Sequence, residues 1–318
     1  MSDEFYLDMG FEVTFRPFEQ ADEDMLFGLW KYAYVHEPSR LSLFREKVWG
    51  DPEYDPELTL LAETGDGPEN QFPIAFAMAV VRETADYRRG HIKLLAVEET
   101  MRRNKLGDHM LYLLEQRLIE RGVEEIRVAE AAPNYLTPGL DVRYTPGMLM
   151  LEAAGYERIG ETYNLGVTLG PYLPTDRKEA RLAKRHGIAS RRARAYDKAL
   201  MAGFLAEHWP AWKAEVEVAF QRKPIALHVA VRGTEMLGFA AYDTNNIGTG
   251  WFGPMGTAPG AQGIGIGAVL LKRCLRDLQA QGLKRAVIPW VGPVRFYANR
   301  VGATIDRVFY RYAKTIAQ

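Results

Sequence analysis

The chain has one cysteine, Cys274, among its 318 residues. A single thiol excludes an internal disulfide, and no cysteine–histidine spacing typical of a metal site accompanies it, so we expect no metal. Cys274 falls inside an apolar helical pattern, which favours a packing role. Long apolar runs are also lacking, because Ile74–Val81 is far shorter than the roughly 20 residues that span a bilayer. We therefore expect no membrane segment.

An excess of charge of one sign is lacking too. The chain has 40 lysine and arginine residues against 41 aspartate and glutamate residues, a net charge of −1, so nothing indicates a nucleic-acid partner. The acidic start, MSDEFYLDMG, does not have the basic and apolar segments of a secretory signal, so we expect a cytoplasmic location. With 47% hydrophobic residues, the composition is typical of a globular protein, and the length suits two domains.

A glycine-rich segment near the C-terminus carries the clearest chemical signal. In Met255–Leu271, MGTAPGAQGIGIGAVLL, residues Gln262, Gly265 and Gly267 stand between a predicted strand and the predicted helix Ala268–Leu278. The start of a helix offers N–H groups without helical partners and a partial positive charge. Glycines let the backbone approach an anion closely. The segment therefore predicts a phosphate-binding turn, with a plain tight turn as the alternative.

Two other phosphate-binding motifs do not fit this segment. A P-loop ends in Gly-Lys-Ser/Thr, whereas Gly267 is followed by Ala268 and Val269. The Rossmann fingerprint needs G-x-G-x-x-G and an acid at the tip of the next strand, whereas these glycines stand two apart and Ala286–Trp290 ends without an acid.

The order Q-x-x-G-x-G resembles motif A of the GCN5-related N-acetyltransferases (the GNAT family), which holds the pyrophosphate of acetyl-CoA. The preceding MGTAP is similar to the end of the family's strand before that motif. The resemblance implies acetyl-CoA as a co-substrate. The cofactor-binding residues that it implies are Met255, Gly256, Thr257, Gln262, Gly263, Ile264, Gly265, Ile266, Gly267 and Ala268.

A second segment resembles motif B of the same family. Phe296–Ala303, FYANRVGA, follows the predicted strand Ala286–Trp290. In the family, the tyrosine of this motif lies beside the thioester sulfur and often acts as the general acid, and here it is Tyr297. A phenol has an ordinary pKa of about 10, close enough to that of a thiol for a proton to be shared. Core packing is the alternative for such a pair of aromatic residues on a helix.

The same pattern occurs about 160 residues earlier, which indicates a domain duplication. Leu95–Gly107 aligns with Met255–Gly267, but Lys105 replaces a turn glycine and Met150 stands in place of the tyrosine. A thioether cannot donate a proton, so we expect the first copy to have lost catalysis. It then serves as a scaffold for the second copy, or still binds a nucleotide through Lys105 and Arg102.

These observations predict an α+β fold of two tandem GNAT-like domains, each a mixed, twisted sheet flanked by helices. The expected divisions are a degenerate domain at 1–170, a linker at 171–186 and a catalytic domain at 187–318. The region around the linker is basic, which favours a solvated connecting helix, with attraction of the coenzyme A phosphates or an acidic substrate as the alternative. Its cations are Arg177, Lys178, Arg181, Lys184, Arg185, Arg191, Arg192 and Arg194.

No motif identifies the general base or the acceptor site. The family often places an acid on the central strand, and the predicted strand Gly250–Thr257 contains none. Asp243 is our first candidate for the base, and Glu207 or His208 is the second, because an ammonium must lose a proton before it attacks. Three further aromatic residues form either an acceptor wall or core: Trp251, Phe252 and Trp290.

We therefore expect an acyltransferase, an acetyl-CoA-dependent N-acetyltransferase that acts by direct transfer in its C-terminal domain. The expected acceptor is a primary amine of a small molecule. The alternatives are a peptide or protein amine as acceptor, or a non-catalytic module that binds acetyl-CoA or another protein. A monomer and a homodimer are both compatible with the sequence.

Overall fold

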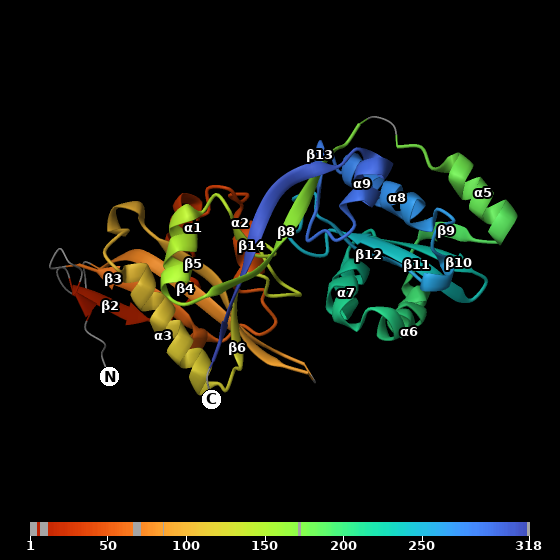
Figure 1. The fold of residues 1–318 in the computed structure, drawn as a ribbon. Helices are drawn as coiled ribbons and strands as arrows, with labels where there is room; N and C mark the ends of the chain where they lie inside the picture. Colours follow the sequence, from red (N-terminus) through yellow and green to blue (C-terminus); the bar gives the residue numbers. More distant parts are fainter. Residues whose placement is uncertain (1–4, 7–11, 66–70, 85, 171–172, 317–318) are drawn as a thin grey trace. The chain divides into compact units, whose positions relative to one another are not determined.

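Two units with separate hydrophobic cores make up the chain (Figure 1). The computed structural model describes residues 5–6, 12–65, 71–84, 86–170 and 173–316. Unit 1 consists of Met1–Thr162 and Phe309–Gln318, and unit 2 consists of Tyr163–Val308.

The sheet of unit 1 is mixed. Strands β1 to β5 pair in chain order, each antiparallel to the next, and β6 lies parallel to β5 with Ile92 opposite Val128. The end of the C-terminal strand β14 is antiparallel to β6 and also pairs with the short strand β7. The bounds are β1 Phe5–Tyr6, β2 Glu12–Arg16, β3 Thr59–Thr64, β4 Phe72–Glu83, β5 Arg88–Val97, β6 Glu125–Val128, β7 Leu140–Asp141 and β14 Thr304–Thr315.

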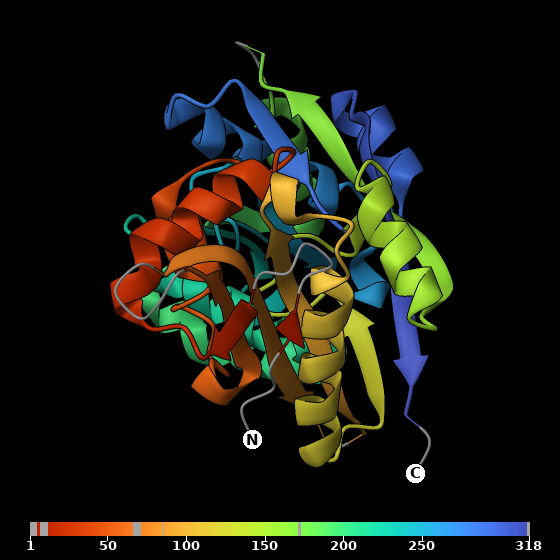
Figure 2. The ribbon, with the colours of Figure 1, turned by 90° about the vertical axis from the view of Figure 1, so that its left-hand side faces the viewer.

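Helices cover both faces of this sheet (Figure 2). Because neighbouring residues of a strand point to opposite faces, Phe76 and Ala77 of β4 belong to different cores. Phe76 packs in one core with Trp30 of α1, and Ala77 packs in the other with Leu114 of α3. The helices of unit 1 are α1 Glu23–Ala33, α2 Leu41–Lys47, α3 Leu106–Glu120, α4 Thr145–Ala153 and three short 3₁₀ turns, Gln20–Asp22, Pro56–Leu58 and Glu99–Met101.

Unit 2 contains an antiparallel sheet in the order β12-β11-β10-β9. The predicted hairpin around Gly233 is present as β10 and β11, and Gly233 has a left-handed φ of 58° that suits a tight turn. The strands are β9 Ala189–Arg192, β10 Leu227–Arg232, β11 Glu235–Tyr242, β12 Phe252–Thr257 and β13 Arg285–Ile288. The helices are α5 Asp176–His186, α6 Lys198–His208, α7 Lys213–Gln221, α8 Ile266–Ala280, α9 Val294–Val301 and the 3₁₀ turns Ala195–Asp197, Pro210–Trp212 and Pro259–Ala261.

Two long strands pass from one unit to the other. The second half of β8 (Glu157–Thr168) lies in unit 2, where Leu165 pairs with Ile288 of β13. The last part of β14 lies in unit 1, where Ala313 pairs with Arg127 of β6. Each unit therefore completes its sheet with a strand that starts in the other unit. The expected domains, 1–170 and 187–318, do not include this exchange of strands.

The α+β architecture with mixed sheets flanked by helices is confirmed. The helix predicted at Ala268–Leu278 is α8, and Cys274 lies buried on it with its thiol 3.4 Å from the carbonyl oxygen of Ala240. Among the residues that the structure describes, no helix is both long and apolar enough to cross a membrane, and no three histidine, cysteine or acidic side chains converge as they would around a metal ion.

Candidate active site

Strand β12 leads through a glycine turn into helix α8. Gly263 has a φ of 81°, and Gly265, the residue before the helix, has a φ of 105°. These are left-handed conformations, which glycine adopts without the steric cost that other residues bear. A Cβ atom built on either glycine would meet no described atom within 4 Å. The turn is therefore left-handed and open on its outer side.

The start of α8 presents backbone amides to this open side. The first helical hydrogen bond runs from the Val269 N–H to the Gly265 carbonyl (3.3 Å), so the amides of Ile266, Gly267 and Ala268 have no acceptor within the helix. The side-chain amide of Gln262 donates to the Thr257 carbonyl oxygen (3.3 Å) and links the two ends of the turn. Together with the positive end of the helix dipole, this arrangement can bind an anion such as a diphosphate.

Strands β12 and β13 part in front of this turn. They meet in a parallel bridge between Trp251 and Val287, where the Val287 N–H donates to the Gly250 carbonyl oxygen (2.8 Å). Beyond the bridge, within the described residues, β12 pairs only with β11 and β13 pairs only with β8. Backbone groups on the two facing edges are therefore available to an extended ligand, which can hydrogen-bond there as an added strand does.

Tyr297 lies on α9, the helix that packs against the glycine turn. A Cβ on Gly267 would lie 3.4 Å from the tip of the Phe296 ring, so α9 contacts the first turn of α8. The Tyr297 side chain is 8% exposed, and its ring centre lies 6.2 Å from that of Phe252, the first residue of β12. Among the described residues its hydroxyl has no hydrogen-bond partner, and burial raises the pKa of the phenol to about 12. Tyr297 is thus a buried, protonated donor beside the parting strands.

The predicted cofactor residues of β12 divide between the two faces of the sheet. Met255 and Thr257 lie on the α8 side, because a Cβ on Gly267 would be 3.7 Å from the Met255 methyl and 3.6 Å from the Thr257 hydroxyl. Gly256 faces the other side, where a Cβ would lie 2.6 Å from the Trp209 ring. Trp209 follows α6 and stacks on Trp212, with ring centres 5.5 Å apart at 18°. An aromatic cluster therefore covers the face of β12 opposite α8.

We expect the substitution Gly256→Ala to destabilise unit 2. The added methyl would overlap the Trp209 ring, and forcing extra volume into a packed core costs about 1–3 kcal/mol. Urea unfolding of the parent and the variant measures the loss. The matched control is Trp209→Ala together with Gly256→Ala, which should lose less stability than the sum of the two single variants. Additive losses would contradict the contact.

Asp243 opens the loop 243–250 between β11 and β12. Its carboxylate accepts a hydrogen bond from the Gly248 N–H (3.1 Å), and its own N–H donates to the Trp251 carbonyl oxygen (2.9 Å). The residue is 2% exposed and has a left-handed φ of 50°, which aspartate tolerates better than most residues. Asp243 therefore holds the loop that precedes the cofactor strand.

The second candidates for the base lie at the end of α6. The His208 imidazole is 3.7 Å from a Glu207 carboxylate oxygen, and the His208 ring packs against those of Phe204 and Trp209. This pair thus lies beside the aromatic cluster on the face of β12 opposite α8.

The other predicted aromatic residues have different environments. Trp251 and Phe252 are buried in unit 2. Trp290 is half-buried and has a φ of 47°, a strained conformation for a bulky residue. Its backbone N–H donates to the Asn164 side-chain oxygen (3.1 Å). The corresponding residue after β6 in unit 1, Glu130, also has a positive φ of 38°.

The contact of Trp209 with Gly256 was not predicted from the sequence, although a glycine inside a strand indicates a close neighbour.

Unit 1 repeats the turn with different side chains. Arg103 and Lys105 have φ values of 67° and 59°, at the places that Gly263 and Gly265 occupy in unit 2. The His109 N–H donates to the Lys105 carbonyl oxygen (2.9 Å), as Val269 does to Gly265. Each non-glycine residue in this conformation costs about 1–2 kcal/mol. The backbone of the turn is therefore kept in unit 1 without the glycines that relieve its strain.

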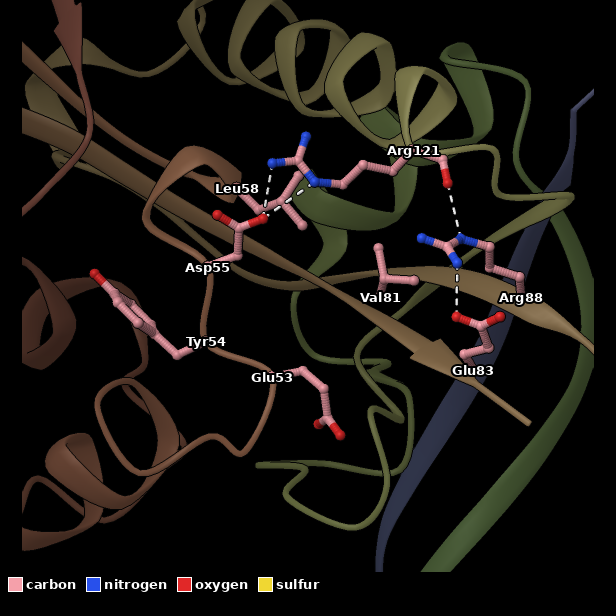
Figure 3. A pocket seen from close by; sticks show the side chains of 8 residues that line it. All are labelled: Glu53, Tyr54, Asp55, Leu58, Val81, Glu83, Arg88 and Arg121. Carbon is pink, nitrogen blue, oxygen red and sulfur yellow. Dashed lines mark hydrogen bonds and ion pairs between the residues drawn. The ribbon is translucent and has the colours of Figure 1, made fainter.

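A pocket of about 390 Å³ in unit 1 contains none of the predicted site residues (Figure 3). Its charged side chains pair with one another and with their neighbours. Arg121 donates to Asp55 (2.7 Å), Arg88 donates to Glu83 (2.6 Å), and Glu53 pairs with Arg82. Because these charges are already neutralised, the pocket does not indicate a charged ligand.

Comparison with known proteins identifies the family. The model of the acetyltransferase (GNAT) family matches residues 23–137 and 192–302, one match in each unit and more than half of the chain together. The chain belongs to the GNAT acetyltransferase family. Acetyltransferases of this family use acetyl-CoA, so the protein is an acetyl-transferring enzyme with two GNAT regions. A search of curated proteins finds no matching relative.

Solved structures of similar fold include tandem GNAT proteins. A GCN5-related N-acetyltransferase from Sphaerobacter thermophilus matches with a TM-score of 0.69 at 15% identity, over 99% of this chain and 98% of that one. A tandem GNAT protein from the clavulanic acid biosynthesis pathway matches with a TM-score of 0.66 at 13% identity, over 96% and 99%. At these identities the comparison establishes the shared fold.

A third similar structure belongs to a longer protein. It is the GCN5-related glucosamine N-acetyltransferase region of a fungal multi-domain GH3 β-N-acetylglucosaminidase, with a TM-score of 0.80 at 16% identity. The match covers 95% of this chain and 38% of the fungal chain.

Proposed function

We propose that unit 2 transfers the acetyl group of acetyl-CoA directly to a primary amine of a small molecule. The observation that carries this proposal is the open glycine turn at the start of α8 with the buried phenol of Tyr297 beside the parting strands. The turn supplies an anion site and the phenol a proton donor, and both lie in one unit. The strained turn of unit 1, with Arg103 and Lys105, supports catalysis by unit 2 alone.

Acetyl-CoA would bind with its pyrophosphate on the backbone amides from Gly263 to Ala268. The fit rests on the unpaired amides of α8 and on the empty space beside Gly263 and Gly265. The extended arm of the coenzyme would then follow the free edge of β12, which places the thioester toward Tyr297.

The proposed reaction is a single displacement at the thioester carbonyl. The amine nitrogen forms the new C–N bond, the C–S bond breaks with its electron pair on sulfur, and the nitrogen loses a proton to a base. A thiol has an ordinary pKa of about 8.5, whereas the pKa of Tyr297 is about 12, so complete proton transfer from the phenol to the thiolate is uphill. Tyr297 would therefore act mainly by donating a hydrogen bond to the sulfur as its charge develops.

Asp243 is our first candidate for the base, and Asp243→Asn tests it. Asparagine keeps an oxygen that accepts the Gly248 hydrogen bond, so the loop should stay in place while the basic group is lost. We expect kcat to fall about tenfold at pH 7, below the usual range for general bases, and the loss to shrink at high pH, where solvent deprotonates the amine. A pH profile of kcat measures this. An unchanged profile would assign Asp243 to the loop alone, and His208→Gln is then the next variant.

The proposed function is tested by a panel of amines with acetyl-CoA, with release of free coenzyme A thiol as the readout. The panel contains small primary amines, an amino sugar such as glucosamine, and peptides with free α- or ε-amines. The amino sugar is included because the fungal region of similar fold is named for glucosamine. Turnover of a small amine above the peptides supports the proposal. Faster turnover of peptides would replace the acceptor class, and binding of acetyl-CoA without any turnover would favour a non-catalytic module.

A further inference from the structure

Strands β5 and β6 of unit 1 part as β12 and β13 do in unit 2. The last paired residues are Ile92 and Val128, and beyond them, within the described residues, β5 pairs only with β4. The Glu98 N–H donates to the Ile74 carbonyl oxygen (2.8 Å). Because hydrogen-bonded pairs alternate along antiparallel strands, Leu95 directs its N–H and C=O away from β4. Unit 1 therefore has the same kind of strand edge that faces the proposed coenzyme arm in unit 2.

The hydroxyl of Tyr34 occupies this edge of β5. It accepts a hydrogen bond from the Leu95 N–H (2.9 Å) and donates one to the Leu95 carbonyl oxygen (3.3 Å). Two residues of neighbouring strands exchange the same pair of hydrogen bonds, so the phenol takes the place of an added strand. Burial raises the pKa of Tyr34, which keeps the hydroxyl protonated and able to donate.

Packing holds the phenol in this position. Tyr34 caps the C-terminal end of α1, where its N–H donates to the Trp30 carbonyl oxygen (2.9 Å). Its ring centre lies 4.7 Å from that of Trp30, which is buried, and 6.4 Å from that of Tyr144. The hydroxyl is therefore carried by a ring that its neighbours hold in place.

Unit 2 has a different aromatic residue at the corresponding place. Trp209 caps the C-terminal end of α6 as Tyr34 caps that of α1. Its ring lies on the face of β12 at Gly256, and an indole has an N–H donor but no acceptor, so Trp209 cannot form both bonds. A phenol therefore takes up the edge groups of Leu95, whereas no such side chain takes up those of the aligned residue, Met255.

We propose that Tyr34 closes the β5 edge of unit 1 to acetyl-CoA, so that each chain binds one coenzyme, in unit 2. This inference rests on the proposed function, in which the extended arm of the coenzyme follows the edge of β12. To bind unit 1 in the same way, the arm would have to displace the phenol from two hydrogen bonds and from its packing on Trp30. Tyr34 is thus a specificity-determining residue, which decides between two copies of one fold.

The experiment measures hydrogen–deuterium exchange of the full chain by mass spectrometry, with and without acetyl-CoA. In the parent, acetyl-CoA should slow exchange in peptides from β12 and leave those from β5 unchanged, because the Leu95 N–H is already bonded. In Tyr34→Ala the Leu95 amide should exchange about tenfold faster, as expected for the loss of one hydrogen bond, and acetyl-CoA should then slow it. Isothermal titration should give one acetyl-CoA per parent chain and a second, weaker site in the variant.

Tyr34→Leu is the second variant, because leucine keeps apolar packing on Trp30 but is too short to reach Leu95. Circular dichroism confirms that each variant is folded. The matched control is Tyr32→Ala, the same substitution on the same helix at a residue that is 73% exposed. It should leave the exchange of β5 and the number of sites unchanged.

Two results would overturn the inference. One is slower exchange of β5 with acetyl-CoA in the parent, and the other is no effect of acetyl-CoA on β5 in a folded Tyr34 variant. Absence of any effect on β12 in the parent would instead overturn the proposed function, and the inference with it.

Discussion

Replacing Gly265 by glutamate is expected to abolish acetyl-CoA binding. At a φ of 105° a side chain is strained, and the space beside Gly265 is open, so the carboxylate would project toward the proposed pyrophosphate position. There it would replace a favourable anion site with like-charge repulsion. We expect the Kd for acetyl-CoA to rise more than about 100-fold, equivalent to about 2.7 kcal/mol, with turnover lost in proportion. Isothermal titration and thiol release measure the two effects.

Two further variants separate the causes of this loss. Gly265→Ala adds the strain without the charge and should weaken binding far less. Lys105→Glu places the same carboxylate at the corresponding position of unit 1, where the residue is exposed and already left-handed, and should leave turnover within a few fold of the parent. Unchanged affinity in Gly265→Glu would refute the placement of acetyl-CoA. A loss in Lys105→Glu as large as that in Gly265→Glu, with the fold intact, would show that unit 1 takes part in catalysis.

The second large effect is expected for Tyr297→Phe. Phenylalanine keeps the ring that packs beside Phe252 and Phe296 and removes only the hydroxyl. Removing one hydrogen-bond donor to the charge that develops in a transition state typically costs about 10²–10³-fold in rate, and a thiolate is a good leaving group, so we expect kcat to fall about 100-fold. The Kd for acetyl-CoA should change little, because the hydrogen bond to sulfur strengthens only as charge develops in the transition state.

The pH dependence provides an independent check on Tyr297. Because the pKa of this phenol is about 12, it stays protonated over the usual working range, and its ionisation should not reduce the rate below about pH 11. Tyr297→Phe should therefore lower kcat by the same factor from about pH 6 to pH 9. Turnover of Tyr297→Phe at the parent rate would mean that water or another group stabilises the charge on the sulfur and that Tyr297 only packs in the core.

The candidate cofactor turn could be predicted from the sequence because its cause is local. Left-handed residues two apart at the start of a helix favour glycine, and Gly263 and Gly265 provide it within one short segment. The helices after the turn were predictable for the same reason, since apolar spacing along α3 and α8 shows which face is buried. The duplication followed from the repeat of these local patterns.

Contacts between distant segments could not be predicted in this way. Trp209 lies on Gly256 across nearly fifty residues of sequence, and a glycine in a strand indicates a close neighbour without identifying it. Arg273 of α8 donates to Glu179 of α5, and these two residues meet only because the two helices pack together. The spacing of apolar residues along a helix shows which of its faces is buried, whereas tertiary packing determines which segments that face contacts.

The sequence by itself determined the α+β class, the two copies of one pattern, and the turn proposed to hold acetyl-CoA. Only the tertiary structure decided which sheet each long strand completes, with the second half of β8 beside β13 in unit 2 and the end of β14 beside β6 in unit 1. The reason is that strand pairing depends on which backbone edges are free after the rest of the chain has folded. Strands pair through backbone N–H and C=O groups, which nearly every residue has. The residues of a strand therefore do not identify which other strand will pair with its edge.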